Sequence, residues 1–90
     1  MDFNSDENGA PRGSHETTLA DLPPGSVAVV VSVDASEPIG RRLLDLGFVP
    51  RTEVRVVRRA PLGDPLEYEL RSTRLCLRRT EAARIRVLPR

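Results

Sequence analysis

The side chains that most often carry out chemistry are scarce in this sequence and are not arranged for it. His15 is the one histidine and Cys76 the one cysteine, and a long stretch of chain separates them. Nucleophilic catalysis needs a base beside the nucleophile, and a transition-metal site needs several Cys or His ligands at short spacing. We therefore expect no catalytic residues, no metal ligands and no cofactor. Cys76 is expected to pack as a small residue on the second face of a strand.

Asp64 is the carboxylate that most invites a catalytic interpretation. It stands between Gly63 and Pro65 in the stretch APLGDP, residues 60–65. It could be read as a general base, but turns select aspartate because its side chain hydrogen bonds to nearby backbone groups. We favour the second interpretation, and we do not expect an enzyme.

The arginines raise the alternative of nucleic-acid binding. The chain has 14 basic residues, all arginine, against 13 acidic ones, for a formal net charge of +1. Arginines can follow phosphates, but glutamates are interleaved with them here, and a single tyrosine and Phe48 offer no stacking platform. We therefore expect a solvated face laced with salt bridges and no nucleic-acid partner. The arginines concerned are Arg41, Arg42, Arg58, Arg59, Arg78, Arg79, Arg84 and Arg86, and the glutamates are Glu53, Glu67, Glu69 and Glu81.

Length and composition indicate one small cytoplasmic domain. Ninety residues can bury a single core, and one cysteine cannot form an intramolecular disulfide, as is usual in the reduced cytosol. No apolar run approaches the roughly 20 residues of a membrane span. The first residues, MDFNSDENGA, are acidic where a signal peptide is basic and then apolar. We expect no direct insertion into a membrane.

The chain divides into a tail and a domain. Residues 1–18 are rich in Asp, Asn, Ser and Gly and have no apolar period, so we expect a disordered N-terminal tail. Residues 19–90 are expected to form the folded domain. Its first segment, LADLPPGS, is a short apolar turn whose prolines and glycine lead into an extended run.

The next two segments predict a strand and a helix. Residues 27–33, VAVVVSV, are β-branched at period two and predict the first strand, with Val29 and Val31 facing inward. Residues 36–48, SEPIGRRLLDLGF, predict a short amphipathic helix. The helix is expected to bury Ile39, Leu43 and Leu46, to begin at a Ser36 cap, and to end at a left-handed Gly47 with Phe48 touching Leu43.

The remainder of the chain predicts further short strands. Residues 52–60 alternate, the prolines of APLGDP interrupt them, and a hairpin with Ser72 and Thr73 at its tip would place Glu67 opposite Arg78. One helical turn in TEAA, capped by Thr80, precedes a last strand. Five short strands leave too many bare edges in an open sheet, so we expect a small closed barrel. The expected inward residues are Val29, Val31, Val54, Val56, Leu70, Leu75, Leu77 and Ile85.

Four motifs carry a resemblance to a known family. They are LADLPPG, RRLLDLGFVP, APLGDP and LRRTEAARIRV, and together they resemble the FeoA family over essentially all of residues 19–88. The resemblance implies a mainly all-β fold: a small SH3-like β-barrel of about five strands with a short inserted helix. It also implies an accessory role in bacterial ferrous iron uptake, through binding to the membrane GTPase-transporter FeoB.

Two further points accompany the resemblance. Arg51 departs from it, because the family commonly has glycine after this proline, so the turn between the helix and the second strand is expected to differ. A similar barrel ends metal-dependent transcriptional repressors, which gives the alternative of an SH3-like interaction module of that kind. This chain shows no winged-helix half, and self-association is compatible with either context.

We expect the partner to dock on the helix and the proline loop. Leu44 lies outside the expected core stripe, and Leu62 stands at the tip of a loop too constrained to fold inward. Exposed apolar residues flanked by arginines are typical anchors of protein interfaces. The alternative is that Leu62 and Leu44 pack on each other. The expected surface consists of Arg41, Arg42, Leu44, Pro61, Leu62, Gly63, Asp64 and Pro65.

Overall fold

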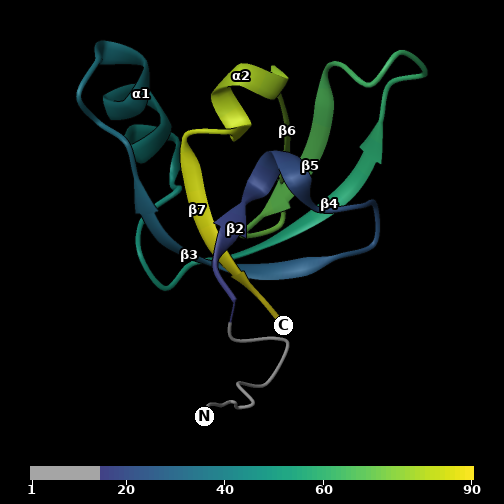
Figure 1. Cartoon of the computed structure of the whole chain (residues 1–90), viewed down its shortest axis with the longest axis horizontal. Helices are drawn as coiled ribbons and strands as arrows, with labels where there is room; N and C mark the ends of the chain where they lie inside the picture. Colours follow the sequence, from purple (N-terminus) through teal and green to yellow (C-terminus); the bar gives the residue numbers. More distant parts are fainter. Residues whose placement is uncertain (1–14) are drawn as a thin grey trace, which may run out of the picture.

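The computed structural model describes residues 15–90, which form one antiparallel sheet with two short α-helices at one end (Figure 1). The described chain is mainly β, as predicted. In chain order its elements are β2 (Thr17–Thr18), the 3-10 turn η2 (Leu19–Asp21), β3 (Val27–Val33), α1 (Pro38–Leu46), β4 (Glu53–Arg59), β5 (Leu66–Leu70), β6 (Thr73–Leu77), α2 (Arg79–Ala82) and β7 (Ile85–Pro89).

The sheet curls without closing. Its six strands have the order β2-β7-β3-β4-β5-β6, so among the described residues β2 and β6 are edge strands without a second neighbour. The expected barrel is therefore not closed, because the edge strands β2 and β6 do not pair with each other. The turn η2 follows the edge strand β2 and contacts β5 on the other side of the sheet order, where the hydroxyl of Tyr68 donates to the carbonyl of Leu19 at 3.4 Å. No helix within residues 15–90 is long and apolar enough to cross a membrane.

The folded domain begins earlier than the sequence predicted. Thr17 and Thr18 pair with Val87 and Arg86 of β7, and Glu16 forms an ion pair with Arg86 at 3.0 Å. Thr17 and Thr18, which the sequence placed in the tail, are thus held in the sheet by backbone pairing although they have no apolar period. Residues 1–14 of the expected tail lie outside the described residues.

Most of the predicted inward residues are confirmed. Val54 and Val56 on β4 and Leu70 on β5 are buried, and Leu75 is partly buried against the core. Leu77 and Ile85 are also buried. The apolar side chains alternate with charged ones on β4 and β5, so the inner face of these strands is unambiguous.

The prediction for β3 is wrong at Val29 and Val31. Ala28 and Val30 point inward instead, while Val29 and Val31 are only half-buried. The pairing with β7 shifts between Val30 and Ser32, so Val31 is the extra residue of a β-bulge. A bulge reverses the alternation of faces, and a strand with apolar residues on both faces does not reveal which half is inward.

The end of α1 follows the prediction. Gly47 has φ of 115°, its N–H donates to the carbonyl of Leu44 at 3.0 Å, and the N–H of Phe48 donates to the carbonyl of Leu43 at 3.2 Å. This is the Schellman arrangement, which satisfies the last carbonyls of the helix. Leu43 is buried and Ile39 half-buried, but Leu46, expected in the core, is 42% exposed.

The start of α1 differs from the prediction. Glu37 occupies the N-cap position, with Pro38 as the first helical residue. Ser36, the expected cap, instead donates from both its N–H and its Oγ to Oδ1 of Asp34, at 3.1 and 2.7 Å. These hydrogen bonds hold the pKa of the exposed Asp34 carboxyl below its ordinary value. The pair forms a turn that sets the direction in which the helix begins.

The β5–β6 hairpin has a different register from the one predicted. Its tip consists of Arg71 and Ser72, both with positive φ of 52° and 68°, and Leu70 pairs with Thr73. The expected tip at Ser72 and Thr73 is wrong by one residue, which moves every cross-strand partner by two positions. Neither tip residue is glycine or asparagine, so residue preference does not identify this turn.

Candidate docking surface

The loop at residues 60–65 has an ordered shape and an exposed tip. The N–H of Ala60 donates to the carbonyl of Pro65 at 3.0 Å, and the N–H of Gly63 donates to the carbonyl of Ala60 at 2.8 Å. Leu62 is 97% exposed at the tip. The prediction that this leucine does not fold inward is confirmed, and the alternative in which it packs on Leu44 is wrong.

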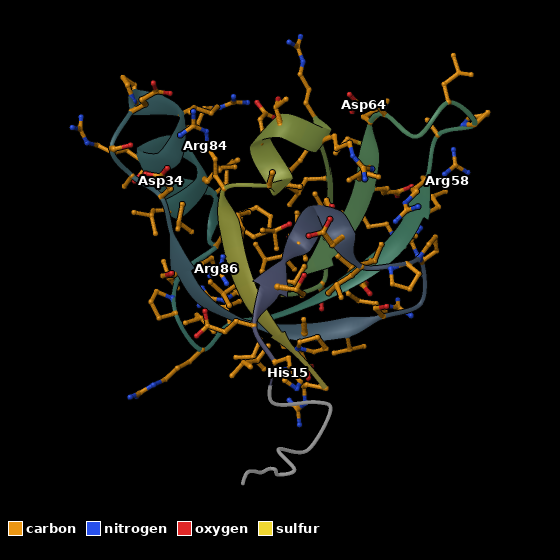
Figure 2. The ribbon with its side chains drawn as sticks, in the orientation of Figure 1. His15, Asp34, Arg58, Asp64, Arg84 and Arg86 are labelled. Atoms are coloured by element: carbon orange, nitrogen blue, oxygen red, sulfur yellow. The ribbon has the colours of Figure 1, made fainter. Side chains whose placement is uncertain are left out.

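Asp64 fixes the base of the loop to α2. Its Oδ1 accepts the backbone N–H of Arg79, the first residue of that helix, at 2.9 Å. Figure 2 shows Asp64 at the start of β5, beside α2. The carboxylate therefore has the structural backbone hydrogen bond that was expected of it, but with α2 and not with a nearby group of its own turn. The Asp64–Pro65 peptide bond is cis.

A second polar contact joins α2 to α1. Oε2 of Glu81 lies 3.7 Å from the guanidinium of Arg42, while its Oε1 accepts the N–H of Arg78 at 2.9 Å. Glu81 thus stabilises the first turn of α2 and reaches the neighbouring helix. The cap of this turn is at Arg78, two residues before the expected Thr80.

The predicted docking residues therefore fall on two sides of α2. Helix α1, which carries Arg41, Arg42 and Leu44, and the loop with Leu62 lie at the same end of the molecule, with α2 between them in the view of Figure 1. Arg41 is exposed and Leu44 half-buried. The sequence analysis missed α2 as the connecting element, because its contacts join residues far apart in the chain. We call this end, made of α1, α2 and residues 60–65, the helical end.

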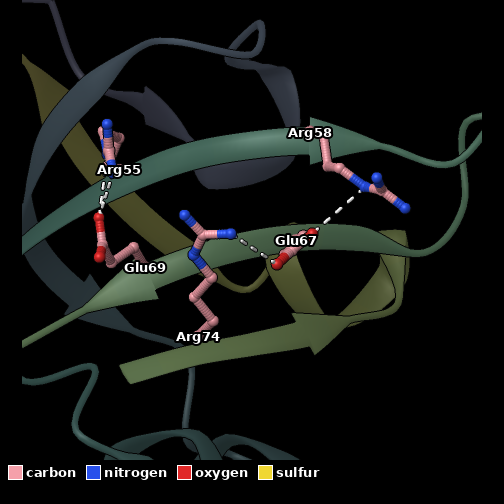
Figure 3. A network of polar contacts seen from close by, with 5 residues as sticks. All are labelled: Arg55, Arg58, Glu67, Glu69 and Arg74. Carbon is pink, nitrogen blue, oxygen red and sulfur yellow. Dashed lines mark hydrogen bonds and ion pairs between the residues drawn. The ribbon is translucent and has the colours of Figure 1, made fainter. Parts of the chain in front are cut away.

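The face of β4, β5 and β6 is laced with ion pairs, as predicted. Nε of Arg55 lies 3.1 Å from Glu69, and Glu67 lies 3.3 Å from Arg58 and 3.8 Å from Arg74 (Figure 3). Further pairs join Arg90 to Glu53 at 2.7 Å and Arg84 to Asp34 and Glu37. All four interleaved glutamates have an arginine partner, so acidic side chains interrupt the arginines across the described surface.

Neither soft ligand lies in a metal-binding cluster. Within residues 15–90, no group of three or more His, Cys, Asp or Glu side chains is placed to hold a metal ion. His15 is exposed. Cys76 is also exposed, on the face that carries Glu67, so the prediction that it packs on the second face of its strand is wrong. Among residues 15–90, no second layer of structure covers that face at Cys76.

A surface groove of about 640 Å³ lies at the opposite end of β4 and β5. Its lining includes Arg51, Thr52 and Arg71, where the Arg71 guanidinium donates to Oγ1 of the buried Thr52 at 3.4 Å. The groove is wide open and mostly polar, unlike the apolar pockets that hold small molecules. It does not adjoin the helical end.

Comparison with known proteins identifies a family over nearly the whole described chain. The model of the FeoA domain matches residues 17–89. A curated relative from Porphyromonas gingivalis, an Fe(2+) transport protein A/Fe(2+) transporter FeoB fusion protein, is 39% identical over 69 residues. That match covers 77% of this chain and 8% of the relative, so this chain spans only a small part of the fusion protein's length.

Solved structures agree with the family model. A FeoA-like protein from Clostridium acetobutylicum has a TM-score of 0.77 at 31% identity, over 82% of this chain and 86% of that one. FeoA from Stenotrophomonas maltophilia, described as a procaryotic SH3 domain protein and solved with zinc, has a TM-score of 0.71 at 45% identity, over 79% and 88% of the two chains. A manganese-dependent transcriptional repressor reaches 0.76 at 18% identity, covering 90% of this chain and 43% of that one, which shows the fold alone.

Proposed function

This chain belongs to the FeoA family, a family of ferrous iron transport, and from that premise we propose that it is an accessory protein that binds a FeoB-like membrane transporter and regulates ferrous iron uptake. It acts in the cytoplasm, by protein–protein contact and without catalysis. The fusion protein from Porphyromonas gingivalis supports this pairing, because it joins the two kinds of protein in one chain. The likeness to the manganese-dependent repressor is one of fold and does not favour the alternative context.

We assign the docking role to the helical end. The observation that carries the assignment is Leu62, a large apolar side chain that is 97% exposed on a loop held in shape by its own hydrogen bonds. A loop that is already ordered loses little conformational entropy on binding. The anchor at Asp64 keeps the loop fixed to α2, and Arg41 and Arg42 supply charged groups at the rim.

The experiment compares Leu62→Asp with Ser72→Asp. Both substitutions add one negative charge at an exposed position, but Ser72 lies in the hairpin tip at the far end of β5. Purified FeoB serves as the binding partner, and each variant is also melted. We expect Leu62→Asp to lose most of its affinity while its melting temperature stays close to that of the wild type, because Leu62 buries almost nothing in the free protein.

Ser72→Asp should bind FeoB as the wild type does. If a folded Leu62→Asp variant binds FeoB with unchanged affinity, the assignment of the loop is wrong. If the wild-type protein itself does not bind FeoB, the proposed partnership is wrong.

A further inference from the structure

Strand β6 is an edge of the sheet that the described chain leaves uncovered. It pairs with β5 on one side, and within residues 15–90 no strand lies on its other side. Thr73, Arg74 and Cys76 are exposed and Leu75 is half-buried. Figure 3 shows β6 beside β5, with Arg74 reaching across to Glu67.

The register identifies which backbone groups face outward. A two-residue hairpin loop makes its flanking residues, Leu70 and Thr73, a hydrogen-bonded pair, and such pairs alternate along an antiparallel ladder. Leu75 and Leu77 therefore direct their N–H and carbonyl groups toward β5. The N–H and carbonyl groups of Arg74 and Cys76 point the other way, where the described chain places no strand to pair with them.

This edge has only one of the features that usually prevent strand addition, its charged side chains. Natural edges are shortened, bulged, interrupted by proline or charged. β6 has five residues, contains no proline and pairs with β5 without a register shift. The other edge, β2, is two residues long and so offers little to a partner. β6 is thus the edge of the described sheet that can accept another strand.

The positive charge around β6 limits which kind of strand can pair with it. Residues 71–79, RSTRLCLRR, contain four arginines and no acidic residue. Arg74 has an ion pair with Glu67, whereas among the described residues the side chains of Arg78 and Arg79 have no acidic partner. A second copy of the chain would place two such arginine-rich segments side by side, which like-charge repulsion opposes.

We propose that β6 accepts an extended acidic segment of a partner protein as an additional strand of the sheet. The outward backbone groups of Arg74 and Cys76 supply the hydrogen bonds, and the arginines select for acidic side chains. Side chains alternate between faces, so the partner residues beside Leu75 and Leu77 are apolar while those on the outer face are acidic. The binding segment therefore alternates acidic and apolar residues. This edge is separate from Leu62 and does not depend on FeoB being the partner.

The test uses a synthetic peptide of alternating glutamate and valine, added to the isotope-labelled full chain. Amide hydrogen exchange is measured residue by residue. We expect slower exchange at Arg74 and Cys76, with affinity that falls as salt is added. A peptide with lysine in place of glutamate should not bind. Absence of protection at these two amides when the peptide concentration reaches about 1 mM overturns the proposal.

Two variants locate the binding on the β6 edge. Cys76→Pro removes an outward N–H without touching the ladder to β5, and it should weaken the peptide about three- to tenfold, the effect of one lost hydrogen bond. Cys76→Ser keeps that N–H and should bind as the wild type. Arg78→Glu changes an exposed side chain and should also weaken binding, which gives a second readout if Cys76→Pro does not fold.

Three results would each contradict the proposal. One is wild-type affinity in both Cys76→Pro and Arg78→Glu. Another is equal binding of the acidic and the basic peptide. The third is protection of Arg74 and Cys76 that rises with protein concentration in the absence of peptide, which would make a second copy of the chain the occupant. None of these results bears on the FeoB experiment with Leu62→Asp.

Discussion

Arg51 adopts a backbone conformation that normally belongs to glycine. Its φ is 76°, in the left-handed region, and its N–H donates to the carbonyl of Val30 at 2.8 Å, which locks the turn before β4 in place. The sequence suggested that this turn would differ because arginine replaces the glycine of related sequences. In this chain the turn has a conformation that favours glycine, and Arg51 bears the strain.

Arg51→Gly should therefore stabilise the protein. A left-handed backbone conformation costs a non-glycine residue about 1–2 kcal/mol, and Arg51→Gly removes this strain. Glycine is also more flexible in the unfolded chain, which offsets about 0.5–1 kcal/mol of the stabilisation. We expect a net increase of about 0.5–1 kcal/mol in the free energy of unfolding, measured by denaturant titration. Arg51→Ala is the control: it removes the same side chain but keeps the strain, so it should bring no increase. Equal effects of the two substitutions would show that the side chain, not the backbone, is responsible.

In the loop at residues 60–65, one structural feature could be predicted from the sequence and another could not. The exposure of Leu62 could be predicted, because two prolines and a glycine prevent the loop from folding inward. The bond from the N–H of Arg79 to Asp64 could not be predicted, since every residue but proline has such a donor and only the fold brings these two together.

At the scale of elements, α1 sits against the chain that precedes it at a point where only glycine fits. A Cβ on Gly40 would lie 2.0 Å from the carbonyl oxygen of Asp34 and 2.6 Å from Cα of Ala35. Both are backbone atoms, so no side chain can move aside. Gly40 is buried in the first turn of the helix, and glycine is less favourable than alanine within a helix.

Gly40→Ala should destabilise the protein although alanine favours helices. Relief of the clash requires α1 to move away from the Asp34 turn, at a cost of about 1–3 kcal/mol in the free energy of unfolding. Asp45→Ala, at an exposed position of the same helix, is the matched control and should be close to neutral. Thermal melting of both variants tests this. A Gly40→Ala protein as stable as the control would mean that the close approach to residues 34–35 is not needed.

The strands differ in how clearly the sequence specifies them. Most of β4 and β5 has apolar side chains on one face and charged ones on the other, and the residues predicted to point inward, Val54, Val56 and Leu70, are all buried. β3 has valines on both faces, so the bulge at Val31 has no sequence signal and the inward face was wrong. The hairpin tip was misplaced for a similar reason, because Arg71 and Ser72 take positive φ without being the residues that prefer it.

At the scale of the whole molecule, Tyr68 connects β5 to η2, the turn that follows the edge strand β2. It is fully buried, and its hydroxyl reaches the carbonyl of Leu19. Burial raises the pKa of this phenol, because the phenolate would lose its solvation. The folded protein therefore keeps the proton at pH values where the unfolded chain, with an ordinary pKa of 10.0, has released it.

Stability should consequently fall as the pH rises above about 10, since the unfolded state gains free energy by ionising and the folded state does not. Below that pH the tyrosine makes no contribution to the pH dependence. Tyr68 is the one tyrosine of the chain, so ultraviolet absorbance reports its ionisation directly. We expect ionisation to coincide with unfolding in the wild type.

Tyr68→Phe is the matched variant for this pH dependence. It should lose about 0.5–1.5 kcal/mol at neutral pH, the net value of one hydrogen bond, and the 3.4 Å length favours the lower figure. Its stability should depend less on pH above about 10, because no phenol remains to ionise. Titration of the wild-type tyrosine near its ordinary pKa, without unfolding, would contradict the prediction.

The pairing of β2 with β7 determines where the chain enters and leaves this domain when the domain is joined to another polypeptide. Thr17 lies opposite Val87, so the chain enters the domain next to the strand by which it leaves, and Figure 1 places both at the end away from α1 and α2. A linker, tag or tethered protein that continues from residue 15 or from residue 90 therefore starts at the same end of the described domain. Immobilisation through a linker before residue 15 or after residue 90 should leave Leu62 equally accessible, so the domain can be joined to a longer polypeptide at its front or its back with the helical end still facing outward.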